Sequence, residues 1–398
     1  MKRAFIILLI TLSVGVVKAQ TSVQGIINEN TTWDESGSPY ILTGRVQIAP
    51  NVKLLINGNV QVTADTKQEL QVFGYLQILG NEEKKPVISN ISIEQGDNEA
   101  DEESFIDINY AHLQDCDLIP PTGQSVYGYY KVLNSVIEGC NQSLFMYMWY
   151  PTSDSEFKGN LITKSGPIVI LQRNSDVYIE NNFIDKQIQV SNYQGIVSLA
   201  NYGVDGAKLI VRYNSFVDTN SIALMYAEGY SDGLFNDATN NYFGKVSDPD
   251  KMILDRKDDL NYHDFIGLTP ILSGHHIDTP LPEVETITLL SPNDKANDVE
   301  LNQRLLWNQD SNSDFYTFQL STDGFSTFVV NESLTDTSFT TSELEYNTQY
   351  SWRVRGSNSS VDGEWSEVWS FTTQVEPPDI ITIVSPTDST RDVTLTPT

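Results

Sequence analysis

Short apolar runs alternate with turn-forming residues along the first part of the chain. Between about Thr32 and Ile93 the runs are apolar at every second position, as in Val46-Gln47-Ile48 and Leu70-Gln71-Val72. Gly, Pro and Asn residues separate these runs, and helical periodicity of useful length is absent. Period-two runs bounded by turn residues predict short β-strands. We therefore expect an all-β protein.

A second pattern recurs between residues 113 and 240, in which an apolar residue is followed by two others and then by Asn or Cys. The copies are Leu113–Cys116, Ile137–Cys140, Phe157–Asn160, Tyr178–Asn181 and Val211–Asn214, and Asn240 extends the series. Successive Asn or Cys positions are 24, 20, 21, 33 and 26 residues apart. A repeat of this length is typical of one coil of a solenoid. Because Asn tolerates left-handed backbone and stacked Asn side chains can hydrogen-bond between coils, we expect these residues to form a ladder along one corner.

The segments before and after these repeats resemble secreted bacterial right-handed parallel β-helices of the pectin-lyase-like superfamily. The resemblance rests on Thr32 to Gly44, Val52 to Val62 and Leu76 to Gly80, and more specifically on Asn240-Asn241-Tyr242-Phe243-Gly244 followed by an acidic stretch. It spans about residues 24 to 273. We therefore predict a right-handed parallel β-helix over residues 20–278. The superfamily contains lyases, hydrolases, adhesins and spacers, so this resemblance identifies a fold better than an activity.

The composition changes at the Pro-rich segment 279–282, which we interpret as a linker. Residues 283–374 resemble a bacterial fibronectin type III domain, with Trp307 and Trp352 as expected core residues and Tyr350 as the corner tyrosine. Residues 379–398 then repeat the start of this domain at an offset of 94 residues. Twenty residues cannot close a β-sandwich. We interpret them as the beginning of a second, truncated repeat, and the chain as a fragment of a longer protein.

The first 19 residues read as an export signal, because Lys2 and Arg3 precede an apolar run that ends at Val17-Lys18-Ala19. No later stretch is long and apolar enough to span a membrane. Removing the signal leaves 21 basic against 53 acidic residues, a net charge of about −32. Such a charge repels phosphates, so nucleic acid is excluded as a partner. We expect an extracellular protein, secreted or held at the cell surface.

The cysteines Cys116 and Cys140 both belong to the repeated pattern. On neighbouring coils their backbones would lie about 4.8 Å apart, which is within the range that a disulfide accepts. Side chains in register on parallel strands point the same way, however, so two stacked buried thiols are an equal alternative.

Aromatic residues cluster between Tyr127 and Tyr150. Strand alternation would send part of this set outward, where flat rings could stack on sugars. The alternative is that the rings cover the core. The glycan-binding candidates are Tyr127, Tyr130, Tyr147, Trp149 and Tyr150.

No catalytic motif accompanies these rings. The aspartate cluster and Gly-His-Gly element of related hydrolases are absent, and Gly274-His275-His276 is interpreted as solvated linker. A lyase would need a cationic base, usually with calcium. The available cations, which we interpret as surface charges, are Lys158, Lys164, Arg173, Lys186, Lys208 and Arg212. Apart from calcium, which the acidic run Glu94, Asp97, Glu99, Asp101, Glu102 and Glu103 could bind, no cofactor is expected.

Three functions follow from these observations. The first is a non-catalytic extracellular scaffold or adhesin that contacts extracellular polysaccharide or other cell-surface components through a lateral face of the β-helix. The second is a polysaccharide lyase or hydrolase, and the third is a purely structural stalk. A cleft that combines a cation, a carboxylate pair and aromatic rings would favour the enzyme, whereas a face without convergent charges would favour binding or spacing.

Overall fold

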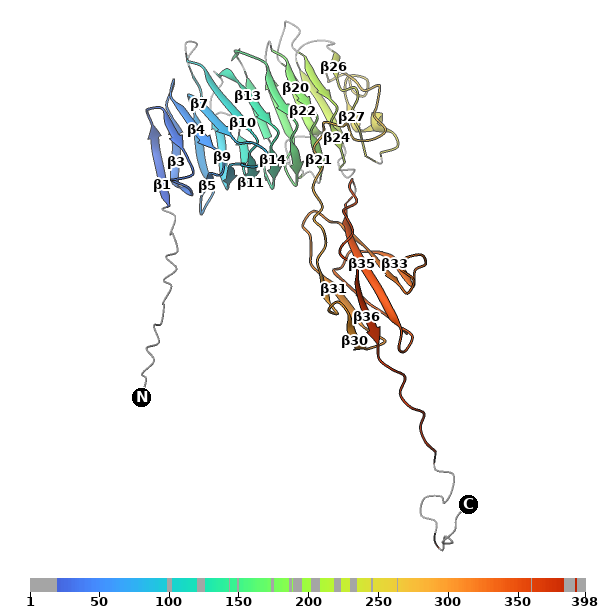
Figure 1. The fold of residues 1–398 in the computed structure, drawn as a ribbon. Helices are drawn as coiled ribbons and strands as arrows, with labels where there is room; N and C mark the ends of the chain where they lie inside the picture. Colours follow the sequence, from blue (N-terminus) through green and yellow to red (C-terminus); the bar gives the residue numbers. More distant parts are fainter. Residues whose placement is uncertain are drawn as a thin grey trace, which may run out of the picture. The chain divides into compact units, whose positions relative to one another are not determined.

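The computed structural model describes most of the chain. The described residues are 20–98, 102–119, 126–142, 144–148, 150–172, 175–185, 188, 195–201, 208–217, 223–229, 235–244, 246–262, 264–358, 360–382 and 391. Contacts divide the chain into two units after Leu281. The first unit is a parallel β-solenoid, and the second contains separate, mainly antiparallel sheets (Figure 1). The one helix among the described residues is the short 3-10 helix η1 (Pro249–Met252).

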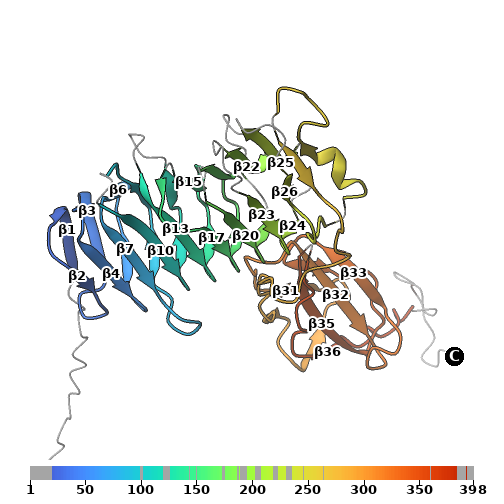
Figure 2. The same cartoon turned by 90° about the horizontal axis from the view of Figure 1, so that it is seen from above.

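One wall of the solenoid is a parallel sheet that we call the lateral sheet. Its strands follow one another in sequence order and lie side by side (Figure 2). They are β2 (Thr31–Trp33), β4 (Lys53–Asn57), β7 (Tyr75–Leu79), β10 (Ser104–Asn109), β13 (Tyr127–Leu133), β17 (Ser155–Lys158), β20 (Val177–Glu180), β23 (Leu209–Arg212), β26 (Phe235–Asp237) and β28 (Phe265–Gly267), with β16 (Tyr150–Pro151) also paired to β13.

The other strands of the solenoid form two parallel rows, each also in sequence order. The first row contains β5 (Gln61–Thr63), β8 (Val87–Ser89), β11 (His112–Gln114), β14 (Val136–Glu138), β18 (Leu161–Thr163), β21 (Phe183–Asp185) and β24 (Ser215–Phe216). The second row contains β6 (Gln68–Val72), β9 (Ile91–Gln95), β12 (Asp117–Ile119), β15 (Leu144–Met148), β19 (Ile168–Gln172), β22 (Gly195–Asn201), β25 (Ala223–Gly229) and β27 (Ile253–Leu254). Both rows start from β3 (Tyr40–Ile48), which is also paired to β1 (Thr21–Ile27).

Each coil therefore passes through the lateral sheet, the first row and the second row in turn. Inward-facing residues of all three stack into one apolar core, as Ile108, Leu113 and Leu118 do in a single coil. Parallel pairing repeats this arrangement from coil to coil, because each strand takes its register from the one before it. The core is thus a long stack of layers.

Left-handed residues turn the chain at two of the corners. Between the lateral sheet and the first row, Asn134, Asn181 and Asn240 have φ values of 49°, 55° and 58°. Between the first and second rows, Asp115 and Gly139 have φ values of 52° and 71°. Gly and Asn enter this region most easily, which explains their frequency in the turns.

The second unit contains two sheets that share one hydrophobic core. The smaller sheet consists of β29 (Leu289–Ser291), β31 (Arg304–Trp307) and β34 (Ser338–Thr340). The larger one has the order β30 (Ala296–Val299), β36 (Trp369–Thr373), β35 (Gln349–Ser357), β32 (Phe315–Ser321) and β33 (Val330–Leu334). Trp307, Tyr350 and Trp352 are buried between them, as predicted. The truncated repeat predicted for residues 379–398 lies almost entirely outside the described residues.

Candidate functional site

The outer face of the lateral sheet carries most of the candidate residues. Along β13, Tyr127, Tyr129 and Lys131 face outward, whereas Gly128, Tyr130 and Val132 face the core. Tyr130 is only 1% exposed, and its burial raises the pKa of its hydroxyl, with Glu94 adding to the effect. Including Tyr130 among the glycan-binding candidates was therefore wrong, because strand alternation turns it inward.

Parallel register arranges the outward aromatic residues in two adjacent columns. In the first, Phe105 pairs with Tyr75 on one side and Tyr129 on the other, and the ring centroids are 4.7 Å and 5.1 Å apart. In the second, Tyr127 and Tyr150 are register partners whose rings stack at 4.4 Å. Tyr75 and Phe105 were not among the candidates, although their alternation with buried neighbours was visible in the sequence.

The structure places one of the remaining two aromatic candidates away from this face. Tyr147 belongs to β15, which is part of the second row and not of the lateral sheet. Trp149 lies outside the described residues. Of the five predicted glycan-binding residues, the structure therefore brings together Tyr127 and Tyr150. Tyr150 is the more open of the two, with 38% of its surface exposed.

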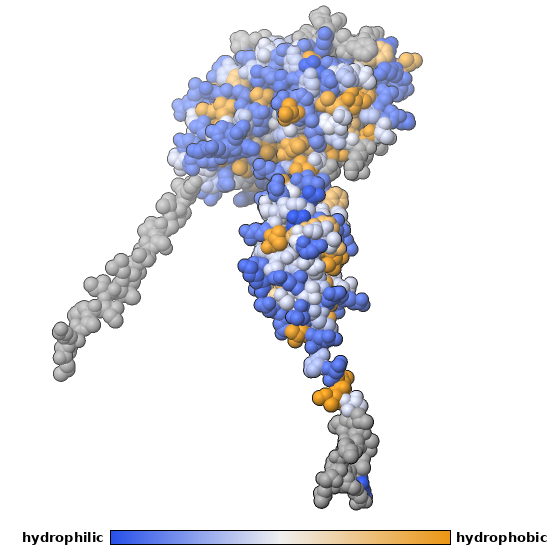
Figure 3. Space-filling view, turned by 45° about the vertical axis from the view of Figure 1, so that its right-hand side comes forward, coloured by the Kyte–Doolittle hydropathy of each residue, from blue (hydrophilic) through white to orange (hydrophobic). Residues whose placement is uncertain are grey.

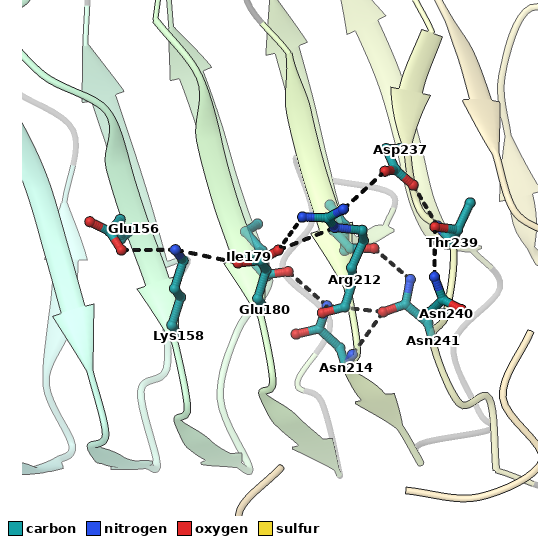
Figure 4. Close-up of polar contacts among 11 residues, drawn as sticks. Glu156, Lys158, Ile179, Glu180, Arg212, Asn214, Asp237, Thr239, Asn240 and Asn241 are labelled. Carbon is teal, nitrogen blue, oxygen red and sulfur yellow. Dashed lines mark hydrogen bonds and ion pairs between the residues drawn. The ribbon is translucent and has the colours of Figure 1, made fainter. Parts of the chain in front are cut away.

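Charged side chains continue the same face beyond the aromatic columns. Lys131 and Lys158 both lie 2.9 Å from Glu156, Lys158 also lies 3.3 Å from Glu180, and Arg212 lies 2.8 Å from Glu180. Arg212 extends the series to Asp237 at 3.7 Å. Figure 4 shows the part of this series from Glu156 to Asp237, which crosses successive strands. We call this alternating series, from Lys131 to Asp237, the charge ladder.

The charge ladder shifts the pKa values of three of its members. Burial alone would lower the pKa of Lys158, but hydrogen bonding and the negative charges of Glu156 and Glu180 raise it above its ordinary value. For Arg212, burial lowers the pKa, but the hydrogen bond and the negative charge of Glu180 raise it, and the pKa of Arg212 is also above its ordinary value. The pKa of Glu156 is lowered, because two lysines outweigh its partial burial. Each of these groups is thus held in its charged form.

Two of the other proposed cations, Lys164 and Lys208, also lack the features of a catalytic base. Lys164 is paired with Glu138 at 3.3 Å and is half exposed. Lys208 is exposed, and its backbone N–H donates to the Asp176 carboxylate. Arg173 and Lys186 lie outside the described residues.

The Asn ladder exists, but two of its four predicted members were wrong. Its side chains come from Asn160, Asn182, Asn214 and Asn241, all fully buried. The Oδ1 atoms of Asn182, Asn214 and Asn241 each accept from the backbone N–H and from Nδ2 of the preceding member, at 2.8–3.0 Å. Part of this series is visible in Figure 4. Asn181 and Asn240 instead have left-handed backbone, and each comes directly before a ladder residue, Asn182 and Asn241 respectively.

The two cysteines do not continue this ladder. Cys116 and Cys140 follow β11 and β14, so they lie at the corner between the two rows. Both are free and buried, which excludes the disulfide alternative in this structure. Burial raises the pKa of Cys116 to about 12, and it raises the pKa of Cys140 as well. Such thiols are unreactive core residues.

Two described members of the acidic run proposed for calcium have separate partners. Glu94 is buried and accepts from Gln71 Nε2 at 2.8 Å, whereas Glu103 accepts from the Thr152 hydroxyl at the edge of the lateral sheet. Glu99 and Asp101 lie outside the described residues. Within the described part of the chain, no group of three or more His, Cys, Asp or Glu side chains could hold a metal ion.

The segment after the last solenoid strand packs against the solenoid. His275 Nδ1 lies 2.8 Å from Ser215 Oγ, and the His275 ring contacts Tyr242 edge-on at 4.7 Å. The Thr279 hydroxyl donates to the Tyr213 carbonyl at 2.8 Å. The interpretation of residues 274–276 as solvated linker was therefore wrong for His275, whose partial burial lowers its pKa.

Comparison with known proteins gives no assignment: no family model, curated protein or solved structure matches the chain. Among the described residues, no helix is long and apolar enough to cross a membrane.

Proposed function

We propose that the mature protein is a non-catalytic extracellular scaffold that contacts neutral glycans through its lateral sheet. The observation that supports this most is the gathering of five aromatic rings in two columns on one outward face, with Tyr150 well exposed. Aromatic rings with polar edges suit a surface that stays wet when unoccupied and binds sugars when they are present. The predicted export signal would deliver this surface to the outside of the cell.

The stacking within the columns determines which rings have a face free to stack on a sugar. A ring in the middle of a column, such as Phe105, has a neighbour on both faces, so it presents only its edge. Among the described residues, Tyr150 stacks on Tyr127 alone. The other face of Tyr150 is therefore the natural place for a sugar ring, and the hydroxyl edges of Tyr127 and Tyr129 offer hydrogen bonds beside it.

The charge ladder supports a non-catalytic role. A base that removes a proton next to a uronate must be deprotonated at the working pH, and this requires a lowered pKa. Lys158 and Arg212 have raised pKa values and are bound to carboxylates. The chain's net charge of −29 also repels acidic polysaccharides, which favours neutral ones. On the face drawn in Figure 3, hydrophobic patches are interspersed among hydrophilic side chains, as expected of a wet contact surface.

We also infer the two fold families suggested by the sequence. A right-handed, pectin-lyase-like helix accounts for the parallel sheets and the Asn ladder, because parallel crossovers are almost always right-handed. For the second unit, the antiparallel order β36-β35-β32-β33 facing β29-β31-β34 supports a fibronectin type III-like sandwich. The Tyr350 hydroxyl accepts from the Glu345 backbone N–H at 3.0 Å, as a corner tyrosine does. In this view the second unit is a spacer or contact module.

Binding to immobilised neutral and acidic polysaccharides, with and without calcium, tests the proposal. We expect weak retention by neutral polysaccharides that Tyr150→Ala abolishes. Tyr346→Ala is the matched control, because Tyr346 is equally exposed, at 38%, but belongs to the second unit. Equal retention of the two variants would remove the aromatic platform. New reducing ends or unsaturated products after long incubation would contradict the non-catalytic role.

A further inference from the structure

The solenoid begins with an open strand edge. Among the described residues β1 pairs only with β3, and it lies at the end of the solenoid in Figure 1 with no other described strand beyond it. Several residues of β1 are exposed to solvent: Ile26 is 65% exposed, and Ser22, Gln24 and Gly25 are also exposed. An unpaired strand edge offers a row of N–H and C=O groups to another strand.

The hydrogen bonds to β3 show which groups are free. The Thr21 N–H donates to the Pro39 carbonyl at 2.9 Å, and the Ile27 carbonyl accepts from the Ala49 N–H at 3.0 Å. In a strand, the backbone groups of successive residues point to opposite sides. The backbone groups of Ser22 and Ile26 therefore point away from the solenoid.

The sequence of β1 lacks the usual protection of such an edge. Its residues, Thr-Ser-Val-Gln-Gly-Ile-Ile, include no charged residue and no proline. Natural edge strands commonly carry Lys or Pro, or are covered by another element. One irregularity interrupts the pairing with β3, between Val23 and Gly25, and the strand continues beyond it to Ile27.

The charge distribution indicates what can approach this edge. Residues 20–63 contain Arg45 and Lys53 against Glu29, Asp34 and Glu35, a net charge of −1, whereas the whole chain carries −29. Two copies therefore repel each other over most of their surfaces but not at this end. A second copy also supplies an identical unprotected strand.

We propose that two copies of the chain associate through β1, with their β1 strands paired antiparallel around a two-fold axis. Antiparallel pairing is the arrangement that lets one strand meet its own copy in an isologous contact. It gives partners to the free backbone groups of Ser22 and Ile26, and it covers the exposed Ile26 side chain. Because the remaining charge repels, added salt should strengthen the association.

Sedimentation velocity on the chain from Gln20 onward tests this proposal over a range of protein and salt concentrations. We expect a monomer–dimer equilibrium that shifts toward dimer with salt. Ile26→Lys should weaken the dimer at least tenfold, because it puts a charged side chain, the usual protection of an edge strand, in place of an apolar one on the paired edge. Leu260→Lys is the matched control: Leu260 is 83% exposed in the same unit, outside β1, and its substitution should leave the equilibrium unchanged.

Ser22→Pro provides a second, independent variant. The N–H that proline lacks faces away from β3, so the solenoid keeps its own hydrogen bonds while the dimer loses one from each copy. Circular dichroism and thermal unfolding would verify that both variants are folded. A wild-type chain that stays monomeric at all concentrations and salts would overturn the proposal and leave the edge to a strand of another protein. Dimers that persist in both variants would place the interface elsewhere.

Discussion

Replacing Asn182 is the sharpest test of how the solenoid corner is stabilised. The Asn182 side chain makes four hydrogen bonds in a fully buried position. Its Oδ1 accepts from the backbone N–H and from Nδ2 of Asn160, and its Nδ2 donates to the Phe157 carbonyl and to Asn214 Oδ1. Asn160 Nδ2 and Asn214 Oδ1 keep other partners if Asn182 is removed. The Asn160 N–H and the Phe157 carbonyl lose the bonds that this side chain supplies.

The expected cost follows mainly from the Asn160 N–H, because the Phe157 carbonyl belongs to β17, which is paired with β13 and β20. A buried polar group left without a partner costs about 1–3 kcal/mol, so Asn182→Gly should destabilise the solenoid by about 1–3 kcal/mol. Asn181→Gly is the matched control, because Asn181 has a φ of 55°, which glycine adopts without strain. We expect that control to change the free energy of unfolding by less than about 1 kcal/mol.

Urea denaturation followed by far-UV circular dichroism would measure both variants. Native-state hydrogen exchange adds a local measurement, since the Asn160 amide should exchange much faster in Asn182→Gly than in the wild type. Equal destabilisation by the two substitutions would refute the assignment of the ladder to Asn182. It would return that role to Asn181, which the sequence pattern had suggested.

Three further outcomes are expected. Because the folded-state pKa of Glu156 is lowered, Glu156 stabilises the fold above its ordinary pKa of 4.5, and this stabilisation is lost as the pH falls below that value. Lys158→Met should reduce the loss of stability in acid denaturation curves. Cys116 and Cys140 should resist thiol reagents at pH 8 in the native chain and react in urea, and their raised pKa values make stability decline above about pH 9, where the unfolded thiols ionise. Tyr350→Phe orphans the Glu345 N–H and should cost about 1 kcal/mol in the thermal unfolding of the second unit.

The sequence alone determined the local structure of this protein. Apolar residues at every second position, separated by Gly, Pro and Asn, predict short strands. The repeat length of 20 to 33 residues indicated coils, and the change of composition near residue 280 marked a boundary close to the observed one. Trp307, Tyr350 and Trp352 were identified as core residues through the resemblance of this region to a fibronectin type III sandwich.

Register was decided only by the tertiary structure. The spacing apolar-x-x-Asn fits Tyr178–Asn181 as well as Ile179–Asn182, and the residue after Asn240 is also Asn. The first Asn of each pair forms the left-handed corner, so the second Asn faces the core. The same spacing also occurs at two different corners, and this is why the cysteines and the asparagines had been assigned to one ladder.

The composition of the outer face also depended on tertiary structure. Lys131, Glu156, Glu180 and Arg212 are far apart in the sequence, and only parallel pairing brings them into one charge ladder. Tyr130 and Tyr129 are neighbours with similar chemistry, yet one is in the core and the other is in an aromatic column. A one-residue shift exchanges the two faces of a strand, so the side that a ring occupies depends on pairing with strands 20 or more residues away.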